Sequence, residues 1–190
     1  MDATSTREGL PMARPSVYFA TLGCAKNEVD TRHMQEALLQ DGFAISDDAE
    51  GCDAIVVNTC SFIRPAIEES VDAIFELAGI EGAHGGGVPV VVAGCLPARF
   101  GDDLAPELVE AAAFVPCADE GDIASVVREC LGLAPSAGAD DRTDSRGAAP
   151  KRQQAAAFAY VKISDGCDRF CSYCTIPYIR GRYHSFSFEE

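Results

Sequence analysis

The stretch Ala54-Ile-Val-Val-Asn58 decides the fold of this chain. It is short, apolar and rich in valine, which is typical of a strand buried on both faces of a parallel sheet. Two further stretches have the same character, Ser16–Leu22 (SVYFATL) and Val88–Ala93 (VPVVVA). Ala113–Val115 can supply a short fourth strand.

Helical patterns fill the intervals between these strands. The clearest places apolar residues at i, i+4, i+7, i+8 and i+11, the stripe of a helix that covers a sheet. Its members are Ile67, Val71, Ile74, Phe75 and Ala78. Pro65 suits the first turn of this helix and Gly79 its end. Further helices are expected over Glu28–Gln40 and Ile123–Leu131. Alternating strands and helices predict a doubly wound α/β domain with a parallel sheet over residues 15–132.

The flanking regions differ in composition. Residues 1–14 are polar, and we expect a mobile tail there. Residues 133–157 are rich in Ala, Gly, Ser, Pro and charge, as in a linker. Ala159–Ile163 then predicts the first strand of a second unit, residues 158–190. That unit is too short to bury a core of its own, so the second domain looks incomplete.

Composition excludes several classes of protein. Apolar residues make up 47% and charged residues 24% of the 190, as in ordinary globular chains. No apolar run approaches the ~20 residues of a membrane span, and the N-terminus lacks the apolar core of a secretory signal. We therefore expect a cytoplasmic protein without membrane contact. The net charge of −15 repels nucleic acid and attracts a basic partner, although an acidic surface without a partner is an equal alternative.

Three cysteines each follow a predicted strand: Cys24, Cys60 and Cys95. We call them the edge cysteines, because parallel strands should bring all three to the carboxyl edge of the sheet, where α/β sheets bind ligands. Three thiolates suit zinc or an iron–sulfur cluster with one open iron. The alternative is three buried cysteines without a function. Cys117 is a possible fourth ligand, whereas Cys52 belongs to the opposite edge and Cys130 to the core.

A second group of thiols follows residues 159–163: Cys167, Cys171 and Cys174. Within eight residues, these loop cysteines can bind one metal centre. The three-residue first gap and the missing fourth cysteine favour a cluster. A zinc site completed by His184 stays open as the alternative. His33 and His84 are isolated, and no acid–base or nucleophilic constellation competes with the thiols.

The motifs around both groups resemble those of a known family. The CxxxCxxC spacing, with Tyr173 before the last cysteine, is similar to the signature of radical S-adenosylmethionine enzymes. Four longer segments, in this order, resemble the methylthiotransferases among them: LGCAKNEVDT (22–31), VNTCSFIRPAIEES (57–70), VAGCLPARF (92–100) and KISDGCDRFCSYCTIPYIRGRYHS (162–185).

That resemblance implies two [4Fe-4S] clusters, one held by the edge cysteines and one by the loop cysteines. The open iron of the second would bind S-adenosyl-L-methionine and cleave it, with an outside electron donor, to a radical that removes a hydrogen from the substrate carbon. A second S-adenosyl-L-methionine would methylate sulfur on the first cluster, and the carbon radical would take up that methylthio group. The resemblance also implies that residue 158 onward begins a radical SAM (β/α) barrel. We expect this part of it to be inactive alone.

The branch of the family is indicated by Ala25-Lys26-Asn27 and by RGRYHS (180–185), which resemble the RimO branch more than the tRNA-modifying branches. RimO proteins modify the β-carbon of an aspartate in a small-subunit ribosomal protein (the twelfth). The acidic surface agrees with this basic substrate. A tRNA adenosine methylthiotransferase and a non-catalytic zinc or iron–sulfur module remain alternatives, and Lys26 and Asn27 can equally be turn residues. Phe186-Ser187 departs from the family, which usually has arginine after the serine.

Overall fold

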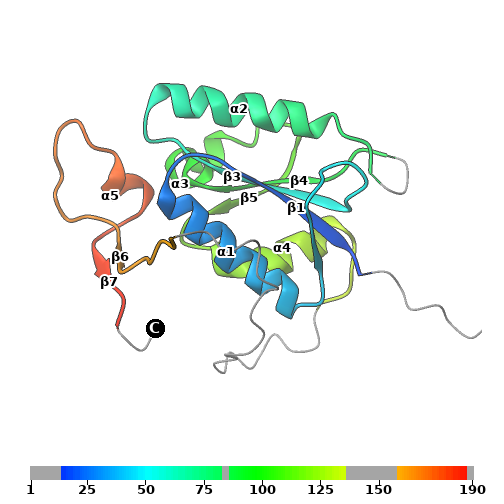
Figure 1. Ribbon diagram of the computed structural model, residues 1–190. Helices are drawn as coiled ribbons and strands as arrows, with labels where there is room; N and C mark the ends of the chain where they lie inside the picture. Colours follow the sequence, from blue (N-terminus) through cyan, green and yellow to red (C-terminus); the bar gives the residue numbers. More distant parts are fainter. Residues whose placement is uncertain (1–13, 83–85, 136–157, 188–190) are drawn as a thin grey trace, which may run out of the picture.

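The protein is built around one parallel sheet. The computed structural model describes residues 14–82, 86–135 and 158–187. Its five main strands are β1 (Ser16–Thr21), β2 (Ala44–Ser46), β3 (Ala54–Thr59), β4 (Val90–Gly94) and β5 (Ala111–Pro116). They lie in the order β2-β1-β3-β4-β5, all parallel (Figure 1). All six residues of β3 are buried, because this strand is central and covered on both faces.

Helices cover both faces, as a doubly wound fold requires (Figure 1). α1 (Ala25–Gln40) and α4 (Ile123–Cys130) pack on one face, where Met34 and Val127 meet Val56 of β3. α2 (Arg64–Ala78) and α3 (Cys95–Phe100) cover the other, where Ile74 meets Val57. Two short 3₁₀ turns complete this part, η1 (Gly101–Asp103) and η2 (Glu120–Asp122). The predicted doubly wound α/β fold is thus confirmed.

In the sheet domain, β2 and α3 were not expected from the sequence, and α1 begins earlier than predicted. β2 has only three residues, too few for a periodic signal, and its place is set by pairing with β1. α3 starts at Cys95 itself, directly after β4. α1 begins at Ala25, three residues before the predicted start, so Cys24 is its N-cap residue.

The predicted strand over Ala159–Ile163 is wrong. Residues 158–163 have no regular secondary structure. The segment 158–187 forms instead three short elements, β6 (Ser164–Asp165), α5 (Ile176–Ile179) and β7 (His184–Ser185). β6 pairs antiparallel with β7. A strand needs backbone hydrogen bonds from a neighbouring strand. In the described structure this pairing starts only at β6, and Ile163 takes part in one backbone hydrogen bond, from the Phe186 N–H to its carbonyl (3.1 Å).

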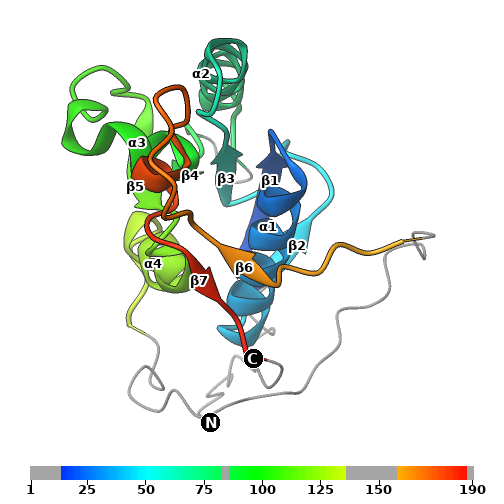
Figure 2. The same ribbon diagram turned by 90° about the vertical axis from the view of Figure 1, so that its left-hand side faces the viewer.

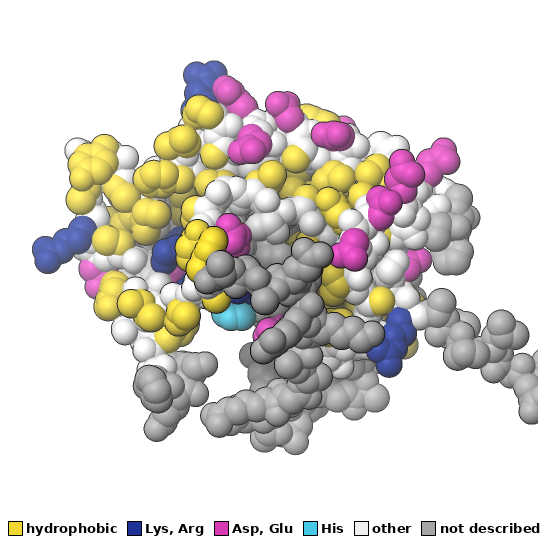
Figure 3. All heavy atoms as spheres, in the orientation of Figure 1, with side chains coloured by type: hydrophobic (Ala, Val, Ile, Leu, Met, Phe, Trp, Pro, Cys, Tyr) yellow, Lys and Arg dark blue, Asp and Glu magenta, His cyan; other side chains and the backbone are white. Residues whose placement is uncertain are grey.

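The segment 158–187 lies against the carboxyl edge of the sheet, with α5 beside α3 (Figures 1 and 2). Acidic side chains gather along the α2 side of the molecule (Figure 3). Within the described ranges, no helix is long and apolar enough to cross a membrane. The predicted tail (1–14) and linker (133–157) fall almost wholly outside the described residues.

Candidate metal centre

The edge cysteines stand where three neighbouring strands end. Cys24 follows β1, Cys60 follows β3, and Cys95 follows β4 as the first residue of α3. The chain reverses its winding direction between β1 and β3, and this switch point is where open α/β sheets form their ligand crevice. As the N-cap residue of α1, Cys24 lies at the positive end of a sixteen-residue helix.

The three thiols are within electrostatic reach of one another. Burial raises the pKa of the Cys60 thiol, and negative charge on Cys95 and on Cys24 raises that pKa further. Cys60 and Cys95 are buried, whereas Cys24 is exposed. The structure therefore gathers an all-sulfur donor set at one edge, with one side open to solvent.

Three hydroxyls hold the backbone of this edge: Thr59, Ser61 and Ser70. The Thr59 hydroxyl donates to a β4 carbonyl (2.6 Å) and accepts the N–H of the residue after Cys95 (3.1 Å). The Ser61 hydroxyl donates to the Cys95 carbonyl (2.8 Å). The Ser70 hydroxyl, from α2, accepts the N–H of Cys60 (3.1 Å). Since all three are buried, these bonds are shielded from water and fix the loops that carry two of the thiols.

Asn27 is not a simple turn residue. It is fully buried in α1, and its amide donates to the Thr59 carbonyl (2.8 Å) and to the Asn58 side chain (3.1 Å). Its Oδ1 lies 3.4 Å from the Cys24 Sγ. Asn27 therefore ties the first turn of α1 to the end of β3 and positions Cys24.

Cys117, the possible fourth ligand, follows β5 and reaches Cys95. A hydrogen bond from the Cys117 thiol lowers the pKa of Cys95 to about 6, against the effect of burial and with help from Arg180. The pKa of Cys117 is raised by donating that bond and by burial. Cys117 thus acts on Cys95 as a hydrogen-bond donor.

A buried arginine joins the two halves of the site. Arg180, in the segment 158–187, is 3% exposed, and its Nη1 lies 2.6 Å from Oδ2 of Asp30 on α1. Its Nη2 lies 3.5 Å from the Cys95 Sγ. Sequence reasoning treated RGRYHS only as a branch marker, and an arginine followed by glycine gives no local sign of burial.

The loop cysteines lie between β6 and α5, on a loop next to the same edge (Figure 2). The Cys167 N–H donates to the Gly181 carbonyl (3.1 Å), which closes the base of the loop. The Cys174 N–H donates to the Cys171 carbonyl (3.1 Å), so the loop carries its own turn. Cys171 is exposed and the other two are partly so, while Tyr173 beside them is 86% exposed.

Among the described residues, no group of three or more His, Cys, Asp or Glu side chains converges on a site for a single metal ion. The loop cysteines and His184 likewise form no such site in this structure. A four-iron cluster makes a different demand, because each thiolate binds an iron of its own and the thiols stand farther apart. The edge cysteines fit that demand. They are an unmixed set of soft donors, and the missing side chain of Gly23 lets the backbone before Cys24 pass directly beside the Cys60 side chain.

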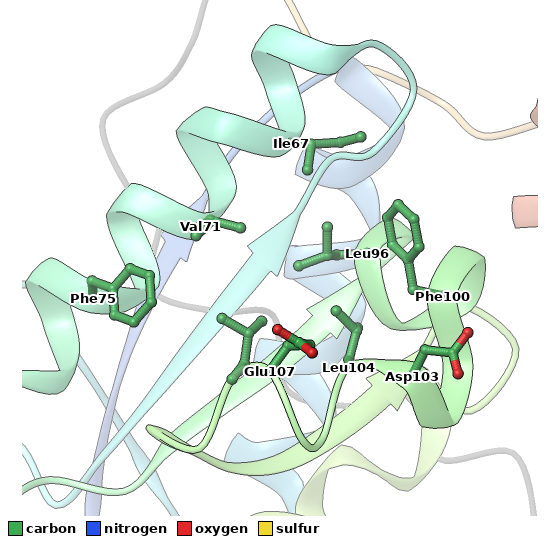
Figure 4. Close-up of a pocket in the computed structure, with 9 residues that line it drawn as sticks. Ile67, Val71, Phe75, Leu96, Phe100, Asp103, Leu104 and Glu107 are labelled. Carbon is green, nitrogen blue, oxygen red and sulfur yellow. The ribbon is translucent and has the colours of Figure 1, made fainter.

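One apolar groove lies away from the thiols. It is a cavity of about 450 Å³ between α2 and residues 96–108, with Ile67, Val71 and Phe75 on one wall and Leu96, Phe100 and Leu104 on the other (Figure 4). No cysteine lines it, so it is separate from the candidate metal centre.

Residues 16–116 match the model of a family described as "Uncharacterized protein family UPF0004", which covers β1 through β5. This chain belongs to that family. The UPF0004 part therefore contains all three edge cysteines, whereas the loop cysteines lie beyond it. The chain is also similar to proteins named "Ribosomal protein uS12 methylthiotransferase RimO". The identity is 38% to that of Synechococcus elongatus and 40% to those of Desulfosudis oleivorans and Heliobacterium modesticaldum.

These alignments take in 94%, 89% and 92% of this chain, respectively, and 39%, 39% and 38% of the three relatives. The chain thus spans about two fifths of the length of the curated relatives that it matches. The resemblance to RimO proteins, predicted from Ala25-Lys26-Asn27 and RGRYHS (180–185), is confirmed. The alignments extend beyond the UPF0004 domain towards the loop cysteines.

Cys52 and Cys130 lie away from the candidate metal centre. Cys52 precedes β3 and is buried with Ile74 on the α2 face, and its thiol donates to the Ala49 carbonyl (3.1 Å). Cys130 ends α4 and packs against the core on the α1 face. Both cysteines thus have the predicted positions, Cys52 before β3 and Cys130 against the core.

Proposed function

We propose that this protein is a methylthiotransferase that adds a methylthio group to the β-carbon of an aspartate in ribosomal protein uS12. The observation that carries the proposal is the gathering of Cys24, Cys60 and Cys95 at the switch point of the sheet. It occurs in a chain that is about two fifths identical, over nearly all its length, to proteins named for this reaction.

Two [4Fe-4S] clusters and S-adenosyl-L-methionine are the proposed cofactors. The edge cysteines would hold the first cluster, and the loop cysteines would hold the second, at which S-adenosyl-L-methionine binds. When bound, the clusters supply an iron that carries the sulfur to be transferred and an electron that generates the radical. Three protein ligands for each cluster leave one iron of each open to these outside groups.

The chain's own residues hold and shield the first site. The hydroxyls of Thr59, Ser61 and Ser70 fix the backbone beside Cys60 and Cys95. The N-terminus of α1 lies at Cys24 and the Arg180 guanidinium at Cys95, so positive charge lies beside two of the three thiols. Burial of two of the thiols limits the access of water, while exposed Cys24 marks the side from which a substrate can approach.

The proposed partners follow from charge and from the relatives' names. A net charge of −15 attracts a basic protein and repels a nucleic acid at long range. Ribosomal protein uS12 is named as the substrate of the relatives, and ribosomes place the reaction in the cytoplasm. An electron donor is the other proposed partner.

The test is the amount of iron and acid-labile sulfide per chain after anaerobic reconstitution. We expect about eight irons in the wild type and about four when either the edge cysteines or the loop cysteines are changed to alanine. The matched control is the double variant Cys52→Ala/Cys130→Ala, which removes two cysteines outside the site and should keep about eight. Iron near zero with tightly held zinc would contradict the proposal and leave a structural metal module.

The substrate is tested separately. The reconstituted chain is immobilised, and retention of purified uS12 is compared with that of bulk tRNA over a range of salt concentrations. We expect retention of uS12 that weakens with salt, because opposite charges attract. Retention of tRNA without uS12 would favour the tRNA-modifying branch instead.

A further inference from the structure

Arg180 contacts four different acceptors, and together they span both parts of the site. Its Nη1 lies 2.6 Å from Asp30 Oδ2 and 3.1 Å from Asp165 Oδ2. Its Nη2 lies 3.3 Å from Asn27 Oδ1 and 3.5 Å from Cys95 Sγ. Asp30 and Asn27 belong to α1 and Cys95 to α3, whereas Asp165 ends β6, two residues before the first loop cysteine. One buried side chain therefore bridges the edge cysteines and the base of the cysteine loop.

The same network holds more positive than negative charge. Lys162 lies 2.6 Å from an oxygen of Asp30 and 2.7 Å from one of Asp165. Lys26 lies 2.9 Å from the other oxygen of Asp165. Three cations, with Arg180, thus meet two carboxylates. The Glu120 carboxyl, also within electrostatic reach of Arg180 and Lys162, adds no negative charge at neutral pH, because burial raises its pKa to about 8. Because Asp30 and Asp165 each have a lysine partner as well, the positive charge of Arg180 is not fully neutralised and faces the nearby thiol.

Lysine could not replace Arg180 in this arrangement. A guanidinium has five N–H donors in a rigid plane, so it can serve two carboxylates, an amide and a sulfur at once. The side chain is 3% exposed and Asp30 is 1% exposed, so water does not compete for these bonds. Hydrogen bonds to the sulfurs and nearby net charge are among the factors that set the reduction potential of an iron–sulfur cluster.

We propose that Arg180 is a positioning residue that docks the cysteine loop onto the edge cysteines and supplies the positive charge beside Cys95. The inference rests on the proposed function, since this charge acts on a cluster only if the edge cysteines hold one. In this proposal Arg180 has two effects. It holds the loop cysteines next to the edge cysteines, and its charge stabilises the more negative, reduced form of the first cluster.

Docking is tested in the metal-free chain with a zero-length carbodiimide cross-linker. The Lys26 amine and the Asp165 carboxylate, 2.9 Å apart, should form an amide that peptide mass spectrometry detects. We expect Arg180→Gln to reduce this product about tenfold or more, since the buried Asp30 carboxylate would lose one of its two cations and the loop its link to α1. Arg180→Lys should recover part of it. The control Arg182→Gln removes an exposed arginine of the same motif and should change nothing. Circular dichroism checks that each variant keeps the α/β domain.

Charge is tested in the reconstituted chain with the loop cysteines changed to alanine, so that only the first site binds iron. Arg180→Gln should shift the reduction potential to a more negative value. Arg180→Lys keeps the charge but not the planar donor geometry and should reverse part of this shift, whereas Arg182→Gln should leave the potential unchanged. A chain that binds no iron there overturns the proposed function and this inference with it. A chain that binds iron, with cross-link yield and potential unaffected by Arg180→Gln, overturns the inference alone.

Discussion

A methyl group built on Gly23 would stand 2.5 Å from the Cβ of Cys60 and 3.0 Å from its Sγ, closer than atoms in folded proteins approach. Gly23 also has a φ of +97°, a conformation that L side chains rarely adopt. The backbone before Cys24 therefore passes directly beside Cys60. This close approach brings the first two edge cysteines together.

Gly23→Ala should lower the free energy of unfolding by about 1–3 kcal/mol for the backbone conformation alone, and further because Cys60 must move. Urea denaturation measures the loss, and iron analysis should show a depleted first site. Gly42→Ala is the matched control, since Gly42 has a φ of +92° and no heavy atom within 4 Å of the position that a Cβ would take. Equal losses of stability in the two variants, with full iron in both, would show that the contact with Cys60 affects neither the stability nor the iron content.

Asn58→Leu should destabilise the domain by about 1–3 kcal/mol, because it keeps the volume but leaves buried polar groups unpaired. The Asn58 amide donates to the Asn27 carbonyl (2.9 Å) and to the Thr31 hydroxyl (3.0 Å), and all three residues are buried. Urea denaturation of Asn58→Leu, Thr31→Val and the double variant gives the coupling between Asn58 and Thr31. Unchanged stability in Asn58→Leu would contradict this account.

Glu120→Gln should stabilise the protein at pH 8 by about 1–3 kcal/mol and have little effect near pH 4. Burial raises the pKa of Glu120 to about 8, negative charge on Asp30 adds to this, and Arg180 and Lys162 oppose it. The folded state therefore keeps a proton that the unfolded state releases above its usual pKa of 4.5, and stability is lost as the pH rises to 8. Within the described structure, Glu120 Oε1 is buried without a hydrogen-bond partner.

Thermal unfolding of wild type and Glu120→Gln from pH 4 to pH 8 measures this difference. The control Asp119→Asn makes the same charge change at the exposed neighbouring residue and should shift stability little at any pH. Parallel pH profiles for wild type and Glu120→Gln would mean that Glu120 is ionised in the folded protein.

Cys117→Ala should leave about four irons at the first site, because three edge cysteines suffice for a cluster with one open iron. Cys117 donates a hydrogen bond to Cys95, so its loss should alter the reduction potential of the site and not its iron content. Cys95→Ala provides the comparison and should lose iron. Loss of iron in Cys117→Ala to the same extent would identify Cys117 as a fourth ligand.

The sequence by itself determined four of the five strands of the sheet and the place of the edge cysteines. The stretch Ala54–Asn58 must be buried on both faces, and the stripe from Ile67 to Ala78 must cover a sheet, because burial and local backbone preference act over a few residues. Parallel strands then share one direction, so residues that directly follow β1, β3 and β4 meet at one edge. No long-range information was needed for this step.

Only the tertiary structure decided which distant side chains complete the site. Arg180 and Asp30 are 150 positions apart, and nothing in the residues around either one predicts a buried ion pair. Cys117 reaches Cys95 because β5 pairs with β4 in one particular register. Residues 159–163 have the composition of a strand but no strand beside them in the described structure, because a strand forms only where a neighbour supplies hydrogen bonds. Such contacts depend on packing between segments that are remote in the chain, which a local pattern does not encode.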